Sequence, residues 1–125
     1  MNLTKLTSTF SVAGQIDAAD LPAIVDAGYR ALICNRPDGE GPGQPLYSTI
    51  EAAAKGLGLD VHYLPVVSGR LTADNVRDFD ALMAQLPRPV LAYCRSGARC
   101  TQLWDLSAAS QKGSQADENG GPGRT

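Results

Sequence analysis

The strongest constraint on the fold is an alternation of short apolar runs with longer segments of helical periodicity. The apolar runs read RALIC, DVHYLPV and VLAY and occupy residues 30–34, 60–66 and 90–93. Each run has the length of a strand, and the segments between them are long enough for the helical crossovers that parallel strands require. The pattern therefore predicts an α/β fold, a single domain with a mainly parallel central sheet flanked by helices on both faces.

Helix start and stop signals divide the remaining sequence. N-capping residues or a proline mark the expected starts, and glycine or proline marks the ends. The three expected helices are bounded by Asp17 and Gly28, by Pro45 and Gly58, and by Thr72 and Pro87. A short strand is also expected at residues 10–13, and a short last helix after Arg99.

The chain has 125 residues, of which 43% are hydrophobic. This is enough for one compact domain with its own core, which we expect to span residues 1–107. From residue 108 the sequence loses apolar periodicity and becomes rich in Gly, Ser and charged residues. That composition predicts a disordered tail over residues 108–125.

Charge and hydropathy exclude several classes of function. The formal net charge of -2 predicts a protein that binds neither nucleic acid nor an anionic membrane, because both need a basic face. No apolar run approaches the length of a membrane span, and no long apolar stretch follows the first lysine, so we expect a cytoplasmic location. The three cysteines include no C-x-x-C pair, and no histidine cluster accompanies them, which predicts reduced thiols, no metal and no cofactor.

Three loops are expected to meet at one edge of the sheet, because the carboxyl ends of parallel strands share an edge and ligands usually bind there. These loops are residues 35–44, 67–71 and 94–99. They carry Arg36, Arg70 and Arg95, which we expect to attract anions locally despite the acidic total. For Arg70, a solvated surface position is an equal alternative.

The last loop reads CRSGAR, and its residue types predict an anion-binding cradle with a nucleophile at its floor. Gly97 permits close backbone approach, Ser96 offers a hydroxyl, and Arg99 can bind two oxygens of an oxyanion at once. A helix N-terminus after the loop, together with the arginines, favours the thiolate of Cys94 and lowers its pKa. The alternative is an inert core cysteine at a strand end. The expected catalytic residues are Cys94 and Arg99, and the expected anion-binding residues are Arg95, Ser96, Gly97 and Ala98.

This loop resembles the active-site loop of rhodanese-type sulfurtransferases and, more loosely, that of cysteine-dependent phosphatases. A second resemblance covers more of the chain, in segments that read AGQI, AGYRALICNRPDGEGPGQP, GLGLDVHYLPV and RPVLAYCRSGARCTQLW. These segments resemble the phosphatase-like domain of beta-lactamase-hydrolase-like proteins, a bacterial family. The resemblance implies a tyrosine-phosphatase-like fold of the dual-specificity type. Members are often described as sulfur transferases, and some are fused to a persulfide dioxygenase, which makes such an enzyme an expected partner.

Sulfur transfer is the preferred function at this stage. Cysteine phosphatases resemble one another in having five residues between cysteine and arginine, whereas rhodanese-like loops often have four, as between Cys94 and Arg99. In this hypothesis Cys94 takes the outer sulfur of a small anionic sulfur donor as a persulfide and passes it to an acceptor thiol.

Two alternatives remain open. The first is a cysteine-dependent phosphatase that acts on a phosphate ester through a Cys94 phosphoenzyme. Its general acid is missing from the loop after VHYLPV, which reads VSGR, so Asp38 in the NRPDGE motif is the candidate substitute. The second alternative is an inactive anion-binding or interaction module.

Further candidates surround the predicted site. The candidates for the pocket rim or for a general acid are Gln15, Asn35, Arg36, Asp38 and Gln44. Arg36 and the two glutamines match positions in the motifs that the chain resembles. For Asn35 and Asp38, ordering of their own turn through side-chain-to-backbone bonds is an equal alternative.

The remaining thiols are candidate redox partners of Cys94. Cys34 ends the strand before NRPD, and Cys100 stands where the resembled family more often has serine. A reversible disulfide with either one would protect Cys94 from over-oxidation. Two other conspicuous residues are predicted to be structural, namely His62 as a packed histidine and Trp104 as part of the core.

Overall fold

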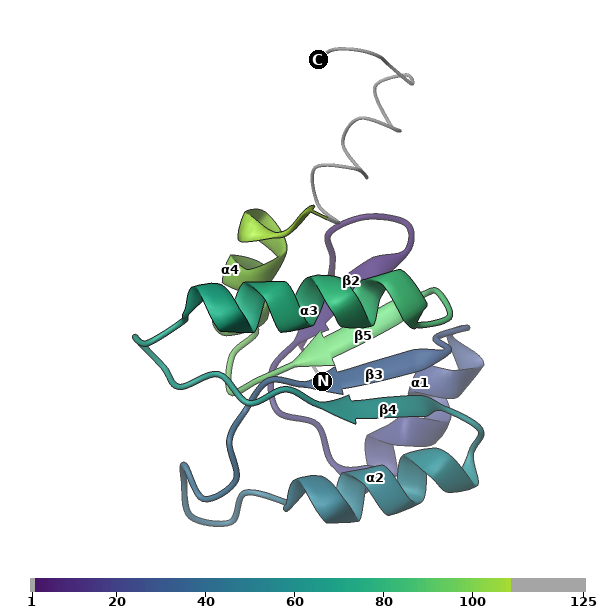
Figure 1. Ribbon diagram of the computed structural model, residues 1–125. Helices are drawn as coiled ribbons and strands as arrows, with labels where there is room; N and C mark the ends of the chain where they lie inside the picture. The colour runs from purple at the N-terminus through teal and green to yellow at the C-terminus, as the bar shows by residue number, and fades with distance from the viewer. Residues whose placement is uncertain (1, 109–125) are drawn as a thin grey trace.

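The computed structural model describes residues 2–108, which form a five-stranded sheet in the order β1-β2-β5-β3-β4 (Figure 1). Strand β1 pairs antiparallel with β2, and all other neighbours pair parallel. The mainly parallel α/β prediction is therefore confirmed. The strands are β1 (Leu3–Lys5), β2 (Phe10–Ala13), β3 (Ala31–Cys34), β4 (Asp60–Tyr63) and β5 (Val90–Tyr93).

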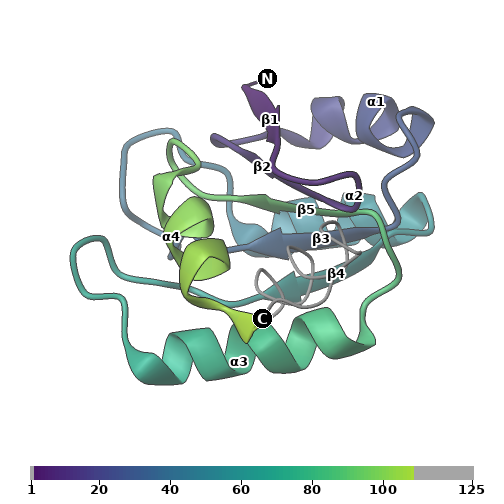
Figure 2. The ribbon, with the colours of Figure 1, turned by 90° about the horizontal axis from the view of Figure 1, so that it is seen from above.

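Helices cover both faces of the sheet (Figure 2). One face packs against α3 and α4, and the other packs against α1 and α2. Every residue of the central strands β3 and β5 is buried, as expected for parallel strands covered on both sides. The helical segments are the 3-10 turn η1 (Ala18–Asp20), α1 (Leu21–Asp26), α2 (Tyr47–Gly56), α3 (Ala73–Gln85) and α4 (Ala98–Leu106).

The face covered by α3 and α4 contains an aromatic cluster. The ring of Phe10 stacks on Trp104 with centroids 4.5 Å apart and meets Phe79 edge to face at 5.7 Å. Trp104 is a core residue, as predicted. This packing joins β2, α3 and α4, and so fixes the helix that follows the cysteine loop.

Most predicted elements form, with shifts at their ends. Thr72 caps α3 as expected, since its hydroxyl accepts from the Asn75 N–H at 3.1 Å while the Asn75 side chain accepts from the Thr72 N–H. Asp17 precedes a 3-10 turn, and the α-helix proper begins only at Leu21. The second helix begins at Tyr47, two residues after Pro45.

Three features differ from the prediction. Strand β1 was not expected, because its short and mostly exposed sequence shows no apolar alternation. Strand β4 ends at Tyr63 instead of residue 66. His62 is not packed in the core: it is half-exposed near the edge of the sheet, with Nε2 2.9 Å from the Asp60 carboxylate. Edge strands tolerate such polar residues because one side faces solvent.

Two further predictions from the sequence concern the C-terminal tail and membrane-spanning segments. Apart from Ala108, the predicted disordered tail lies outside the described residues. Within residues 2–108, none of the helices has the length and hydropathy needed to cross a bilayer.

Candidate active site

The site is built around residues 94–99, which run from the end of β5 into the first turn of α4 and are called the anion loop below. Strand β5 delivers Cys94 at its carboxyl end, and α4 begins at Ala98. The turn into the helix needs Gly97, whose φ of +93° is in the left-handed region that side chains disfavour. The loop is thus a tight strand-to-helix connection with its N–H groups close to the cysteine.

The end of β2 holds the anion loop from one side. The Cys94 N–H donates to the Ala13 carbonyl at 3.2 Å, and the Gln15 N–H donates to the Arg95 carbonyl at 3.2 Å. Gly14 lies between these contacts, and a Cβ there would stand 3.1 Å from the Arg95 carbonyl oxygen. The glycine of the AGQI motif therefore allows the two backbones to approach.

Cys94 is buried, with 1% of its surface exposed, and its sulfur accepts a hydrogen bond from the Gly97 N–H at 3.1 Å. A hydrogen bond from the Cys100 thiol, followed by hydrogen bonds from the backbone N–H groups of Cys100, Ser96 and Arg99, lowers the pKa of Cys94 to about 5. These donors outweigh the burial, which acts in the opposite direction. Cys94 is consequently a thiolate at neutral pH, the reactive form of the residue.

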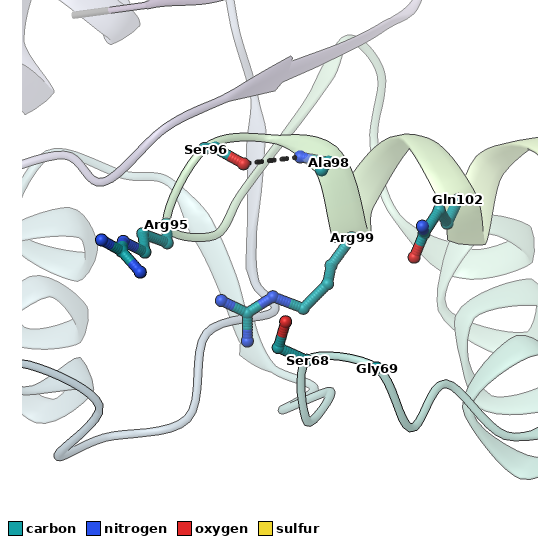
Figure 3. Close-up of a pocket in the computed structure, with 7 residues that line it drawn as sticks. All are labelled: Ser68, Gly69, Arg95, Ser96, Ala98, Arg99 and Gln102. Carbon is teal, nitrogen blue, oxygen red and sulfur yellow. Dashed lines mark hydrogen bonds between the residues drawn. The ribbon is translucent and has the colours of Figure 1, made fainter.

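Arg99 is the last residue of the anion loop and belongs to the first turn of α4, from which its side chain extends along the pocket (Figure 3). Its Nη1 donates to Glu40 Oε2 at 2.7 Å and to the Val66 carbonyl at 2.8 Å, and its Nη2 donates to Glu40 Oε1 at 2.9 Å. The side chain expected to bind two oxygens of a ligand thus binds two oxygens of Glu40. Glu40 is not among the site residues predicted from the sequence, although it belongs to the NRPDGE motif.

Arg36 extends this contact into a network of side chains. Its Nε donates to Glu40 Oε1 at 3.1 Å, and its Nη1 donates to Gln15 Oε1 at 3.1 Å. The hydrogen bond from Arg99 lowers the pKa of Glu40, with a further contribution from Arg36. Glu40 is therefore ionised and has no proton to donate. Gln15, Arg36, Glu40 and Arg99 are called the arginine–glutamate network below.

The other predicted rim residues bond within their own surroundings. Asp38 Oδ1 accepts from the Tyr47 N–H at 2.8 Å, at the start of α2. Gln44 accepts from the Glu40 N–H at 3.0 Å and donates to the Pro37 carbonyl at 2.9 Å. Asn35 is buried and donates to the Leu64 carbonyl at 2.8 Å. Their contacts match the structural alternative, in which these side chains order the loop.

An open pocket lies between the anion loop and the loop after β4 (Figure 3). In this view the Arg99 side chain points toward Ser68, whereas Arg95 extends away to the other side. The Ser96 hydroxyl accepts from the Ala98 N–H at 3.3 Å. Arg70 is exposed and does not line the pocket. The lining residues are Ser68, Gly69, Arg95, Ser96, Ala98, Arg99 and Gln102.

The three cysteines are free thiols in different environments. Cys100 belongs to the same core cluster as Cys94, under α3 and α4. Cys34 belongs to the cluster on the opposite face of the sheet, and its thiol donates to the Arg36 carbonyl at 3.3 Å. Of the two candidate redox partners, the geometry brings Cys100 to Cys94 and directs Cys34 away. Among residues 2–108 there is also no group of three or more His, Cys, Asp or Glu side chains that could hold a metal.

The fold and the anion loop match one described family. A model of the family described as beta-lactamase hydrolase-like protein, phosphatase-like domain, matches residues 2–111. The chain belongs to this family. The resemblance inferred from the sequence motifs is thereby confirmed, and the chain is a phosphatase-like domain.

Two curated members of the family share substantial identity with the chain. The beta-lactamase hydrolase-like protein of Agrobacterium fabrum (strain C58 / ATCC 33970) is 35% identical over 109 residues, which cover 87% of this chain and 25% of that protein. The protein of the same name from Xylella fastidiosa (strain Temecula1 / ATCC 700964) is 30% identical over 118 residues, which cover 94% and 27%. The chain thus spans about a quarter of the length of these relatives.

Solved structures place the phosphatase-like domain among phosphatase folds. A candidate phosphatase from Neisseria meningitidis Z2491 superimposes with a TM-score of 0.78 at 32% identity, covering 93% of this chain and 88% of that one. A candidate phosphatase from Shewanella putrefaciens CN-32 gives 0.77 at 21%, covering 88% and 69%. Tk-PTP in a mutant form gives 0.60 at 13%, covering 77% and 62%. At these lower identities the likeness concerns the fold alone.

Proposed function

We propose that the chain is a cysteine-dependent phosphatase that hydrolyses small phosphate esters with the Cys94 thiolate as nucleophile. One observation carries the proposal: Cys94 is buried, its sulfur accepts a hydrogen bond from the Gly97 N–H of the anion loop at 3.1 Å, and its pKa is lowered to about 5. The similarity to phosphatase-like proteins supports the choice of phosphorus as the atom attacked. Phosphatase activity is therefore placed before sulfur transfer, whereas the sequence alone favoured sulfur transfer.

The reaction would proceed in two displacements at phosphorus. In the first, the Cys94 sulfur forms a bond to phosphorus while the ester P–O bond breaks and the alcohol oxygen leaves with the electron pair. In the second, water attacks the phosphocysteine, and the thiolate leaves as inorganic phosphate is released. The loop N–H groups and Arg99 would stabilise the charge on the three equatorial oxygens in both steps.

The carboxylates near the anion loop determine which alcohols can leave, because a poor leaving group needs a protonated carboxyl group as general acid. Glu40 is ionised between two arginines, and Asp38 is bonded to the Tyr47 N–H. Among the described residues of the loop after β4, Val67–Leu71, there is no carboxylate either. Without a general acid, the best substrates are esters whose alcohol is already acidic, such as aryl phosphates.

Sulfur transfer is the second candidate, and the same observation favours it. The leaving group of a persulfide or of thiosulfate is a thiolate or sulfite, which needs no proton. Cys94 would attack the outer sulfur, the donor S–S bond would break, and the departing thiolate would carry the electron pair. An acceptor thiolate would then take the outer sulfur and regenerate Cys94. A persulfide dioxygenase is the proposed partner in this case only.

One pair of assays on the wild type and on Cys94→Ser separates the candidates. We expect wild type to release p-nitrophenol from p-nitrophenyl phosphate and the variant to release none. If wild type instead leaves this ester intact but gains one cyanide-removable sulfur from thiosulfate or glutathione persulfide, sulfur transfer replaces the phosphatase proposal. If neither reaction occurs with Cys94 reduced, the chain is an anion-binding module.

A further inference from the structure

We propose that Glu40 is the positioning residue of the site, because its carboxylate fixes the guanidinium of Arg99 so that the remaining Nε–Nη2 edge of that group is left for the ligand anion. The inference rests on the proposed function only in that the anion loop binds an anion. It gives the NRPDGE motif a specific task, which is to supply the carboxylate that orients the arginine rather than a general acid.

Three of the N–H groups of Arg99 are occupied by protein acceptors, and two remain for a ligand. A guanidinium has five N–H groups in a planar fork. Two bonds to Glu40 and one to the Val66 carbonyl use three of them, all on Nη1 and Nη2. The two that remain, on Nε and Nη2, lie side by side along the lateral edge of the plane. That edge can accept two oxygens of an oxyanion without displacing Glu40.

Glu40 is itself held from several directions. Arg36 Nε donates to its Oε1 at 3.1 Å, and Gln44 accepts from its backbone N–H at 3.0 Å. Arg36 is in turn bonded to Gln15 at 3.1 Å. Arg36 and Arg99 are each less than a tenth exposed, whereas the Glu40 side chain is 23% exposed and reaches both cations from the surface of the site. Hydrogen bonds from both arginines, and not burial of the carboxylate, therefore hold it in place.

Glu40 could either position Arg99 or merely compensate its charge, and the two roles have different consequences for anion binding. As a mere counter-charge or a resident competitor, Glu40 would weaken anion binding, and its removal would strengthen it. As a positioning residue, it holds Arg99 against the loop, and its removal would weaken anion binding. The two roles therefore predict opposite signs for the same substitution.

The test uses the alkylation of Cys94 by two reagents of similar size. Iodoacetate is an anion and iodoacetamide is neutral, so the ratio of their rates at Cys94 reports how well the site attracts and orients an anion. In Glu40→Gln we expect this ratio to fall by about tenfold, which is the lower end of the effect of losing one hydrogen bond to a charged group. The matched control is Glu51→Gln, which removes a carboxylate from the surface pair with Lys55 and should leave the ratio unchanged.

Two further variants show whether Glu40 acts through Arg99. In an Arg99→Lys background, adding Glu40→Gln should change the ratio by less than about twofold, because the partner that Glu40 positions is gone. Glu40→Asp keeps the charge on a shorter side chain and should give an intermediate ratio. Cys34 and Cys100 should stay unreactive in every variant, which verifies that the fold is retained.

The outcomes separate this inference from the proposed function. An unchanged or higher iodoacetate preference in Glu40→Gln overturns the positioning role, as does an equal effect in the Arg99→Lys background. A tenfold fall in the ratio supports it even if p-nitrophenyl phosphate is not hydrolysed, since that second result concerns the reaction and not the orientation of Arg99.

Discussion

Cys94 and Cys100 are buried in the same hydrophobic cluster, yet their thiols differ in acidity. The pKa of Cys94 is lowered to about 5, whereas burial raises the pKa of Cys100 well above its ordinary value. Cys100 lies inside α4, and the hydrogen bond from its thiol is the largest cause of the low pKa of Cys94. Backbone N–H groups at the turn into α4 act in the same direction, and the Gly97 N–H donates to the sulfur at 3.1 Å. The hydrogen-bond donors around Cys94, and not burial, therefore make it a nucleophile.

Replacing each of the two cysteines in turn should give the largest difference in phosphatase rate. Cys94→Ser should lose more than about 10³-fold of the phosphatase rate, because the nucleophile itself is gone. Cys100→Ser keeps a hydroxyl donor beside Cys94 and should retain most of the rate. Initial rates with p-nitrophenyl phosphate measure both, and an active Cys94→Ser variant would exclude the nucleophile assigned here.

Mild oxidation tests whether the two thiols are also chemical partners. Peroxide should convert the Cys94 thiolate to a sulfenic acid, which the neighbouring Cys100 thiol then attacks with loss of water to form a disulfide. Activity should fall and return with a dithiol reductant. Peptide mapping is the measurement, and a disulfide from Cys94 to Cys34, or no Cys94-containing disulfide, would contradict this pairing.

The backbone that supplies the donors can be altered without touching either sulfur. Gly97→Ala places a Cβ at φ +93° and 3.5 Å from the Ala13 carbonyl, so it should cost about 1–2 kcal/mol of unfolding free energy. It should also raise the pKa of Cys94 by moving the N–H that contacts the sulfur.

Gly58→Ala is the control for this change, since Gly58 has φ +83° and lies in open space at the end of α2. A similar loss of stability is expected there, with no change in the pKa of Cys94. Denaturant melts and pH-dependent alkylation give the two quantities. Equal pKa values in both variants would mean that the Gly97 N–H does not stabilise the thiolate.

The smallest expected effect is that of Asp38→Asn. The Asp38 carboxylate accepts from the Tyr47 N–H, and an asparagine oxygen can accept the same bond. The rate with phosphotyrosine, whose phenol leaves less readily than p-nitrophenol and so depends more on a proton donor, should therefore stay within about twofold of wild type, whereas loss of a general acid would cost about 10²–10⁴-fold. A loss of that larger size would restore Asp38 as the proton donor.

The features of the fold and of the site that the sequence predicts are those determined by residues close together in the chain. Alternating apolar runs and crossovers predict the parallel sheet, and the shared edge of parallel strands predicts that the three loops converge. The CRSGAR loop points to Cys94 and Arg99 because glycine, a helix start and arginine each have a known effect on a neighbouring thiol. These predictions need no knowledge of distant contacts.

The parts that the sequence does not predict depend on tertiary geometry. Glu40 is 59 positions from Arg99, and nothing in NRPDGE distinguishes its carboxylate from that of Asp38 until the loop is folded. Cys34 and Cys94 end neighbouring strands, but their side chains point to opposite faces. Strand β1 forms by pairing with β2, since its own residues carry no strand pattern.

A thiolate nucleophile at Cys94 can be tested by measuring the alkylation rate of each cysteine as a function of pH, peptide by peptide in the folded protein. We expect Cys94 to react with a midpoint near pH 5, while Cys34 and Cys100 remain unreactive through neutral pH. A midpoint for Cys94 at the ordinary thiol value of about 8.5 would contradict a thiolate nucleophile at this site.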